Sequence, residues 1–389
     1  MKKVLFITYK NPEKQDVGDH VYTWQILTAL KHSGMYVHVV AYKENESDYE
    51  NNSKLAELVD RVTYTLHHQR NKLIIALSSH PITIANRYQQ RMVETVNNVL
   101  QKENFDAVFI NMFKMSWMVE HIKAKNIVYI SHNNEALTAK SIFQGTNNMI
   151  LKTFYYIDYI KTRHDEKRYL NKMTTITAIS DSDADSLSKL SSSIPIKVLP
   201  PMVKLMDSSE KVDGKKKNQK HAIICGSFTW IAKILNLKNV LNVPTLCKLR
   251  DNGIKLFVVG RASEDLVSEV NEKYDCVEMT GGVDCVQPYY DKSHVAVVPE
   301  KIGGGFKLKI AEAIQNRIPI VAIRGAVTDN EMIPGCHFVE VEDFEDIPQA
   351  VVDLLNNEDL QKTLVDNCLQ LFKKKYSLEN MINVLDTCI

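Results

Sequence analysis

The chain has 389 residues, of which 44% are hydrophobic and 24% charged, and its formal net charge is +1. This composition is that of a globular protein long enough for two domains, and the balanced charge argues against nucleic-acid binding over a large surface. No apolar segment approaches the roughly 20 residues that a membrane-crossing helix needs. We therefore expect a cytoplasmic protein whose membrane contact, if it has one, is at the inner face of the membrane.

The cysteines predict neither a disulfide framework nor a zinc site. None of the seven forms a C-x-x-C pair, and several lie within apolar runs, where a reduced thiol serves as a small hydrophobic side chain. They are Cys225, Cys247, Cys276, Cys285, Cys336, Cys368 and Cys388.

Strand-like and helix-like segments alternate along the first half, which predicts a parallel sheet built from strand–helix–strand units. Helices are expected at 20–33, 83–101 and 148–172, with Gly34 as the C-cap of the first. Strands are expected at 4–8, 37–41, 106–111, 126–131, 174–179 and 196–199.

The alternation starts again after a polar, charged and patternless segment. We expect domain 1 at 1–203, joined by a C-terminal helix at 377–389, a linker at 204–220 and domain 2 at 221–376. These halves predict an α/β fold of two doubly wound, Rossmann-like domains facing a cleft, with ligands at the carboxyl ends of the strands. The strands of domain 2 are expected at 221–225, 255–259, 277–280, 294–298 and 319–323.

A glycine-rich turn follows the strand 294–298. Gly303, Gly304 and Gly305 precede a helical pattern, so free N–H groups at the helix start could bind phosphate, and Lys307 and Lys309 add positive charge. Glu312 could accept hydrogen bonds from sugar hydroxyls. The alternative is an ordinary strand-to-helix turn.

Four segments of domain 2 resemble, in order, the donor-binding domain of GT-B glycosyltransferases near the retaining family 4. They are 226–230, 257–261, 280–290, and 303–313 followed by Pro319-Ile320-Val321. The common family pattern has two glutamates, of which Glu312 fits the second, whereas the first falls at Gly304. The resemblance implies a GT-B fold and these donor-binding residues: Gly18, Ser227, Arg261, Gly282, Val283, Gly303, Gly304, Gly305, Phe306, Lys307 and Glu312.

The resemblance also implies roles in catalysis. Lys309 would face the donor diphosphate, Glu312 would hold the ribose, and Lys233 is the preferred second cation, with Lys307 and Arg261 as alternatives. Residues 131–135 resemble an H-N-x-E motif, in which His132 could bind the donor sugar or assist the acceptor. A structural role for His132 is the alternative. The expected catalytic residues are His132, Lys233, Lys309 and Glu312, and the acceptor-side residues are Asp19, His20, Asn133 and Glu135.

No metal is expected. Asp181, Asp183 and Asp185 alternate like the start of a calcium loop, but Ser186 and Ser192 replace the required glycine and glutamate. A helix start with Ser180 as N-cap explains the run better. The resemblance implies no cofactor besides a nucleotide-diphosphate sugar as co-substrate.

The resemblance implies a hexosyltransferase-type enzyme of cell-surface polysaccharide synthesis. It would move a sugar, with a UDP-sugar favoured, to a glycan or lipid-linked acceptor with retention and without a metal. Two alternatives stay open: a catalytically inert glycan-binding or partner subunit of another transferase, and a nucleotide-sugar epimerase. Residues 61–91 mix basic and apolar side chains, which suits peripheral contact with anionic lipid, although core residues beside solvated charges would look similar.

Overall fold

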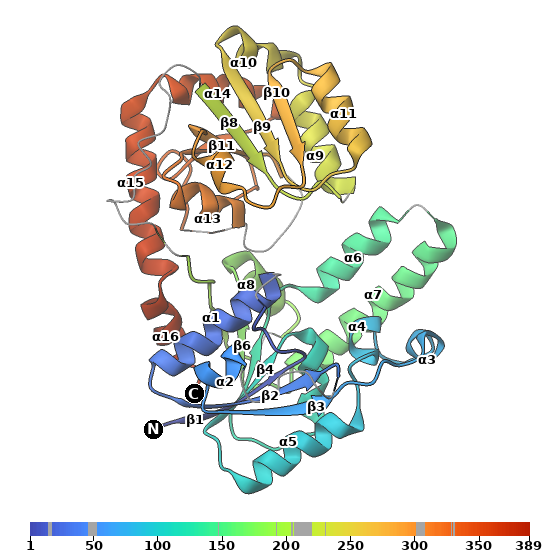
Figure 1. The fold of residues 1–389 in the computed structure, drawn as a ribbon. Helices are drawn as coiled ribbons and strands as arrows, with labels where there is room; N and C mark the ends of the chain where they lie inside the picture. Colours follow the sequence, from blue (N-terminus) through green and yellow to red (C-terminus); the bar gives the residue numbers. More distant parts are fainter. Residues whose placement is uncertain are drawn as a thin grey trace. The chain divides into compact units, whose positions relative to one another are not determined.

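The computed structural model describes residues 1–14, 18–45, 53–146, 148–191, 193–203, 205, 220–229, 231–300, 308–327, 329 and 331–389 (Figure 1). They form two compact units. Unit 1 comprises Met1–Met202 and Leu378–Ile389, and unit 2 comprises Val203–Ser377. Most of the expected linker lies outside the described residues.

The described residues of unit 1 contain one sheet of seven parallel strands in the order β3-β2-β1-β4-β5-β6-β7. The order reverses between β1 and β4, which is the switch point of a doubly wound sheet. The strands are β1 (Lys3–Thr8), β2 (Tyr36–Lys43), β3 (Arg61–Leu66), β4 (Ala107–Asn111), β5 (Ile127–Ile130), β6 (Thr175–Ala178) and β7 (Ile196–Val198).

Helices cover both faces of this sheet. The helices in the described part of unit 1, not all of which lie on the sheet, are α1 (Gly18–His32), α2 (Lys54–Leu58), α3 (Lys72–Ala76), α4 (Ile82–Ala85), α5 (Gln90–Lys102), the 3-10 helix η1 (Phe113–Glu120), α6 (Glu135–Gly145), α7 (Met149–Leu170), α8 (Asp181–Ser188) and α16 (Leu378–Asp386). Successive side chains of a strand point to opposite faces. Val4 and Phe6 therefore pack with α1, α2 and α16, whereas Leu5 and Ile7 pack with α5, α7 and η1.

Unit 2 repeats this plan. Its described residues contain one sheet of six parallel strands in the order β10-β9-β8-β11-β12-β13, and the order reverses between β8 and β11. The strands are β8 (Lys220–Cys225), β9 (Ile254–Val259), β10 (Val277–Gly281), β11 (Val295–Val298), β12 (Ile320–Ile323) and β13 (Val339–Val341).

The helices of unit 2 pack with its strands around one hydrophobic core, which includes Leu256, Val297 and Phe372. They are α9 (Ile231–Leu241), η3 (Pro244–Leu246), α10 (Cys247–Asp251), α11 (Glu264–Lys273), α12 (Gln287–Tyr290), α13 (Leu308–Gln315), η4 (Phe344–Asp346), α14 (Ile347–Leu355) and α15 (Glu358–Lys375).

The expected strands are present, with ends that differ by one or two residues, whereas β3, β13 and α6 were not expected. The expected helix 83–101 is wrong, because the chain breaks between α4 and α5. Side chains from elsewhere bind the carbonyl groups at the break: Arg70 donates to Ala85, His67 contacts Asn86 and Tyr42 donates to Arg87. These bonds support a turn in place of helical backbone bonds.

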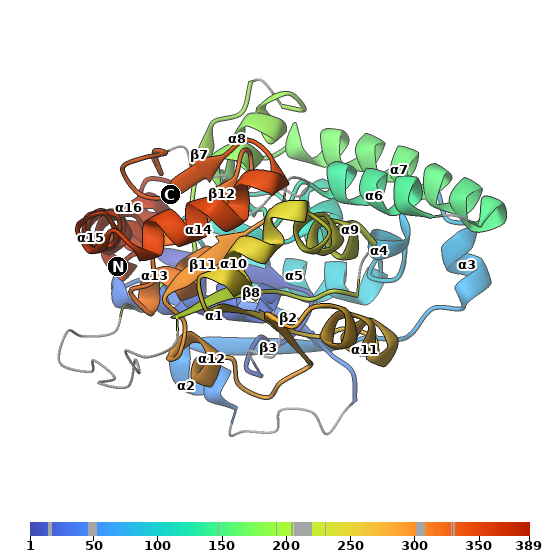
Figure 2. The same cartoon turned by 90° about the horizontal axis from the view of Figure 1, so that it is seen from above.

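Helices α6 and α7 form a hairpin, which we call the α6–α7 hairpin. It reaches away from the sheet of unit 1, and its two helices lie side by side in Figures 1 and 2. Asn134 caps α6 by accepting from the N–H of Leu137 at 2.9 Å. Asn148 caps α7 by accepting from Ile150 and Leu151. Among the described helices, none has the length and apolar content that crossing a membrane requires.

The cysteines are all free thiols, as the sequence predicts. Five of them are at least partly buried, but Cys247 and Cys285 are exposed, so the expectation that they serve as small hydrophobic side chains is wrong for these two.

Truncating Leu385 should destabilise unit 1, because its fully buried side chain joins α16 to the core beneath α1. We expect Leu385→Ala to lower the free energy of unfolding, measured with urea, by about 2–5 kcal/mol. Asn383→Ala, on the exposed side of the same helix, is the control. An equal effect of the two changes would contradict the packing of α16 on unit 1.

Candidate active site

The carboxyl edge of the unit 2 sheet carries most of the expected donor residues that the structure describes. Gly226 follows β8, Glu300 lies two residues after β11, and these two strands flank the switch point. Chain connections leave in opposite directions at a switch point, and the carboxyl ends of the strands beside it are where doubly wound sheets bind ligands.

Two glycines let the ends of β8 and β9 approach closely. A Cβ atom at Gly260 would lie 1.6 Å from the carbonyl oxygen of Gly226, and Gly260 has a φ of +140° that side-chain-bearing residues rarely adopt. The N–H of Gly226 donates to Val259 at 3.0 Å, and that of Phe228 donates to Arg261 at 2.7 Å. The turns after both strands are thereby joined through their backbones.

Two lysines lie at this edge. Lys309, in the first turn of α13, pairs with the carboxylate of Glu300. Its Nζ is so close to Gly226 that a Cβ there would be 3.2 Å away. Burial and the charge of Lys309 lower the pKa of Lys233, in the first turn of α9. Positive charge is therefore concentrated beside the glycine turn, and a bound anion would relieve the repulsion between the two ammonium groups.

Glu312 is held by a buried tyrosine. Its Oε2 accepts a hydrogen bond from the hydroxyl of Tyr290 at 3.0 Å, and Tyr290 is 1% exposed. Burial, together with the nearby charge of Glu312, raises the pKa of the Cys225 thiol to about 11. Glu312 thus presents a carboxylate of fixed orientation, which can accept hydrogen bonds from hydroxyl groups.

The other expected donor residues of unit 2 lie around this centre. The hydroxyl groups of Ser227 and Thr229 are 3.0 Å apart. Arg261 approaches Gly282, where a Cβ would lie 3.5 Å from Arg261 Cγ, and Val283 is partly buried against the core. The expected residues Gly303, Gly304, Gly305, Phe306 and Lys307 lie outside the described residues.

A second polar group occupies the carboxyl edge of the unit 1 sheet. His132 follows β5 and its side chain is 3% exposed, with Nδ1 3.8 Å from Asp19 Oδ1 in the first turn of α1. Lys114 of η1 lies 3.8 Å from the other oxygen of Asp19. The interaction with His132 lowers the pKa of Asp19, and burial lowers the pKa of His132 while Asp19 opposes that shift.

Asn111, the last residue of β4, fixes the proton position on His132. Its amide nitrogen donates to the hydroxyl groups of Thr8 and Thr23, and Thr23 donates onward to the carbonyl of Asp19. The amide oxygen of Asn111 therefore faces His132 Nε2, at 2.9 Å. Nε2 carries the proton in the neutral ring, so Nδ1 on the Asp19 side is available to accept one.

The residue after Asn111 has a strained backbone. Met112 is buried with φ 72° and ψ 154°, a region almost restricted to glycine and worth about 1–3 kcal/mol of strain. This turn leads from β4 into η1 and brings Lys114 near Asp19.

The buried carboxyl group of Glu166 contacts the backbone at the start of α6. Glu166 of α7 accepts from the N–H groups of Glu135 and Ala136 at 2.9 and 3.0 Å. Burial raises the pKa of Glu135 to about 7 and the pKa of Glu166 to about 8. The loop that carries His132 is thus tied to α7.

The remaining acceptor-side predictions have different surroundings. His20 is buried, and its Nε2 lies 3.2 Å from the hydroxyl of Tyr9. Asn133 is exposed, and its carbonyl accepts from Ser131. Gly18 is the first residue of α1.

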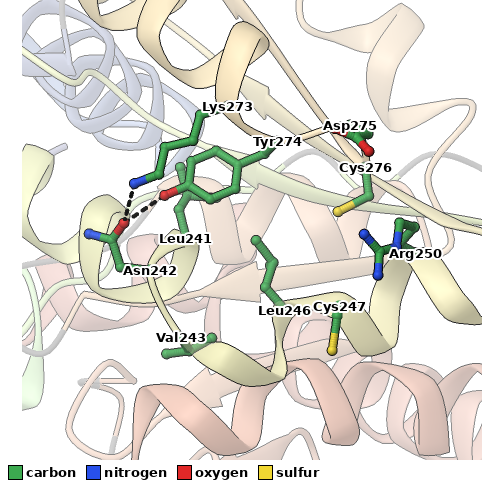
Figure 3. Close-up of a pocket in the computed structure, with 10 residues that line it drawn as sticks. All are labelled: Leu241, Asn242, Val243, Leu246, Cys247, Arg250, Lys273, Tyr274, Asp275 and Cys276. Atoms are coloured by element: carbon green, nitrogen blue, oxygen red, sulfur yellow. Dashed lines mark hydrogen bonds between the residues drawn. The ribbon is translucent and has the colours of Figure 1, made fainter.

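Figure 3 shows a cavity of about 260 Å³ elsewhere in unit 2. It lies between the ends of α9 and α11, near the amino-terminal ends of β9 and β10, and therefore opposite the carboxyl edge. Asn242 accepts there from Lys273 and from Tyr274, as the dashed lines indicate.

The run of aspartates after Ser180 begins a helix. Ser180 caps α8 by accepting from the N–H of Asp183, which confirms the predicted helix start. In the part of the chain that the structure describes, no group of three or more His, Cys, Asp or Glu side chains is placed to hold a metal ion.

Sequence reasoning missed Asn111 and Lys114 as members of the site. Asn111 closes an apolar strand run, and a polar residue at the carboxyl end of a buried strand is a signal that could have been used. Lys114 has no comparable signal, because its position depends on the strained turn at Met112.

Comparisons with known proteins agree with this architecture. Residues 219–357 match the model of the family described as Glycosyl transferases group 1. A curated relative, an uncharacterized 44.6 kDa protein in the cps region of Klebsiella pneumoniae, is 20% identical over 98% of each chain.

Solved structures show the fold. Sucrose-phosphate synthase from Thermosynechococcus elongatus has a TM-score of 0.67 at 15% identity, with 100% of this chain and 98% of that chain covered. HepE from Anabaena, solved in complex with UDP, has a TM-score of 0.66 at 11% identity, with 100% and 99% covered. The two parallel-sheet units therefore have the GT-B fold.

Replacing Glu166 should change the pH dependence of stability. Burial raises its pKa from 4.5 to about 8, so in this interval the folded protein holds a proton that the unfolded chain releases. The contribution of protonated Glu166 to the free energy of unfolding is complete below about pH 4.5 and is lost as the pH rises through about 8. We compare the free energy of unfolding of the wild-type protein with that of Glu166→Gln. Their difference, wild type minus variant, should fall by on the order of 3 kcal/mol between about pH 5 and about pH 8.

Urea unfolding at several pH values measures this difference. Glu272→Gln, at an exposed carboxylate of α11, is the control and should differ from wild type by a constant amount. A constant difference for Glu166→Gln as well would contradict a raised pKa.

Proposed function

We propose that the protein is a retaining, hexosyltransferase-type glycosyltransferase that uses a nucleotide-diphosphate sugar. The observation that carries this proposal is the grouping of Lys309, Lys233 and the tyrosine-held Glu312 around the Gly226 turn at the switch point of unit 2. A diphosphate needs cations and close backbone approach, and a ribose needs a carboxylate acceptor. The family match of residues 219–357 supports the same assignment.

The donor diphosphate would bind beside Lys309 and Lys233. It would compete with Glu300 for Lys309 and relieve the repulsion between the lysines. Glu312 would accept from the ribose hydroxyls, while Ser227, Arg261, Gly282 and Val283 would complete the donor contacts. We assign further backbone N–H donors to Gly303, Gly304 and Gly305, beside Phe306 and Lys307, and a supporting donor contact to Gly18. UDP is our first choice of nucleotide, because HepE was solved in complex with UDP.

Unit 1 would supply the groups that contact the transferred sugar and the acceptor. His132 Nδ1 and the Asp19 carboxylate can both accept hydrogen bonds from hydroxyl groups, and Asn111 keeps Nδ1 unprotonated in the neutral ring. His20, Asn133 and Glu135 would line the acceptor side. Lys114 lies next to this position, and its charge adds to that of His132 in lowering the pKa of Asp19.

The reaction would be a front-side displacement. The acceptor hydroxyl oxygen forms a bond to the anomeric carbon on the face from which the nucleoside diphosphate leaves, while the bond from that carbon to the phosphate oxygen breaks. The acceptor proton passes to the departing phosphate oxygen. Lys309 and Lys233 stabilise the negative charge that develops on the diphosphate, so neither a side-chain nucleophile nor a metal ion is needed.

The proposed setting is cell-surface polysaccharide synthesis, with a glycan or lipid-linked acceptor at the inner face of the membrane. The curated relative's place in a cps region supports this setting.

A nucleotide panel should identify the donor base. We expect one nucleoside diphosphate, with UDP first, to raise the melting temperature of the wild-type protein in a concentration-dependent way. Glu312→Ala and Lys309→Ala should lose that shift because they remove the ribose acceptor and a diphosphate cation.

Lys362→Ala, at an exposed lysine of α15, is the matched control and should keep the shift. A wild-type protein that responds to no nucleoside diphosphate or nucleotide sugar would exclude the transferase and favour an inert partner subunit. Isomerisation of a bound nucleotide sugar without an acceptor would instead indicate an epimerase.

His132→Gln should separate catalysis from donor binding. We expect it to keep the nucleotide-induced shift in melting temperature and to lower kcat for sugar transfer by about 10²-fold, since it removes the imidazole whose Nδ1 would orient a sugar or acceptor hydroxyl group by accepting its hydrogen bond. His32→Gln, at an exposed histidine of α1, should retain the wild-type kcat. Unchanged turnover in His132→Gln would leave that histidine with a structural role. Product analysis by NMR should show a retained anomeric configuration.

A further inference from the structure

Exposed large apolar side chains are concentrated on one part of unit 1. Among the described residues, all but Met1, Leu235, Leu308 and Ile333 lie on α3, on the residue that ends it, or on the α6–α7 hairpin. The most exposed on α7 are Met149 at 75% and Ile150 at 82%, and Leu77 at the end of α3 is 86% exposed. Isolated exposed apolar residues are common, whereas a contiguous group of this size marks an interaction surface.

The outer half of α7 makes no contribution to the core of unit 1. The buried residues of α7 all lie from Thr162 onward, and Ala136 alone is buried in α6. The hairpin is supported by contacts between its own rings, with the centroid of Phe143 5.4 Å from those of both Tyr156 and Tyr159. Its aliphatic side chains are therefore available to another surface.

The apolar side chains do not form a single stripe. Met149, Ile150 and Leu151 are consecutive and all exposed. Consecutive helical residues point in directions about 100° apart, so the first turn of α7 is apolar on more than one side. A protein groove would cover one side of such a helix, whereas lipid surrounds an inserted turn.

The charge of these segments also favours lipid. No acidic residue occurs between Glu135 and Asp158, where Lys140 and Lys152 provide the charge. Similarly, the sequence around α3 has no acidic residue between Arg61 and Glu94 but contains Arg70 and Lys72. Basic residues beside apolar ones are attracted to anionic headgroups, and each contributes to the binding of a peripheral protein.

In both Figures 1 and 2, α3 and the α6–α7 hairpin extend from the same side of the unit 1 sheet. We propose that α3 and the outer half of this hairpin dock unit 1 on an anionic lipid bilayer. Met149, Ile150, Leu151 and Leu77 enter the headgroup and acyl boundary, and Lys140, Lys152 and Lys72 contact the lipid phosphates. The end of the hairpin at the first turn of α7 inserts to this depth, and the hairpin does not cross the bilayer. The α3 part falls within residues 61–91, and the hairpin adds a second, larger contact.

Vesicle co-sedimentation of the full chain tests this proposal without any nucleotide, so its outcome is independent of the glycosyltransferase activity. We expect the protein to bind phosphatidylcholine vesicles that contain phosphatidylglycerol, and to bind pure phosphatidylcholine at least tenfold more weakly. High salt should weaken the binding to anionic vesicles. Absence of binding to anionic vesicles would overturn the proposal.

Three variants test which residues contact the lipid. Met149→Ser/Ile150→Ser and Lys140→Glu/Lys152→Glu should each lower the vesicle partition coefficient by about tenfold. Ile333→Ser, at a 56% exposed apolar residue of unit 2, is the matched control and should bind as wild type does. Equal binding of all variants would overturn the assignment to the hairpin. Melting temperatures within error of wild type would establish that the variants are folded.

A second copy of the chain is the competing occupant of this surface. Light scattering coupled to size-exclusion chromatography, at several protein concentrations, measures the self-association of the wild-type protein and of the same variants. Self-association that Met149→Ser/Ile150→Ser abolishes, in a protein that does not bind anionic vesicles, would replace the bilayer with a dimer interface. A monomer that binds the vesicles supports the proposal.

Discussion

The backbone contact between Gly226 and Gly260 controls the geometry of the unit 2 edge. Parallel strands hold their ends at a fixed spacing, and here the two turns approach until a single Cβ would overlap a carbonyl oxygen. Lys309 Nζ lies beside the same turn, 3.2 Å from where a Cβ of residue 226 would be. The glycine turn is thus held in place by covalent geometry and sheet hydrogen bonds, whereas Lys309 is held by its ion pair with Glu300. An incoming anion therefore finds the backbone already placed and has to draw only the Lys309 side chain away from Glu300.

The polar edge of unit 1 relies on buried hydrogen bonds. Thr8, Thr23, Asn111 and His132 form one connected chain whose donors and acceptors match, and Asp19 ends it at the surface. In such a network each group orients the next, so a change at Thr8 can affect His132 without contact between them. Strain at Met112 and the carboxyl groups of Glu135 and Glu166, whose pKa values desolvation raises, lie next to it, which places unfavourable free energy where function is proposed.

The sequence was sufficient to predict the described strands other than β3 and β13 and the doubly wound fold class, because buried parallel strands are short apolar runs between turn residues. It was insufficient at 83–101, where the helical pattern continues but Tyr42, His67 and Arg70 bind the backbone and end α4. Glu312 could be found from a motif, whereas Tyr290 as its partner depends on tertiary structure. The apolar pattern of α7 predicted a helix and gave no sign that its outer half leaves the core.

The path of the chain through the two units has a consequence for synthesis. Unit 2 is inserted between Met202 and Leu378, so α16 leaves the ribosome only after all of unit 2. Until then the face of the unit 1 sheet that packs with α1 lacks Met381, Leu385 and Cys388, and apolar surface stays uncovered. The unit 2 core also depends on α15, whose Phe372 is made just before α16. Unit 1 therefore cannot complete its core before unit 2 has been synthesised, although most of unit 1 is made first.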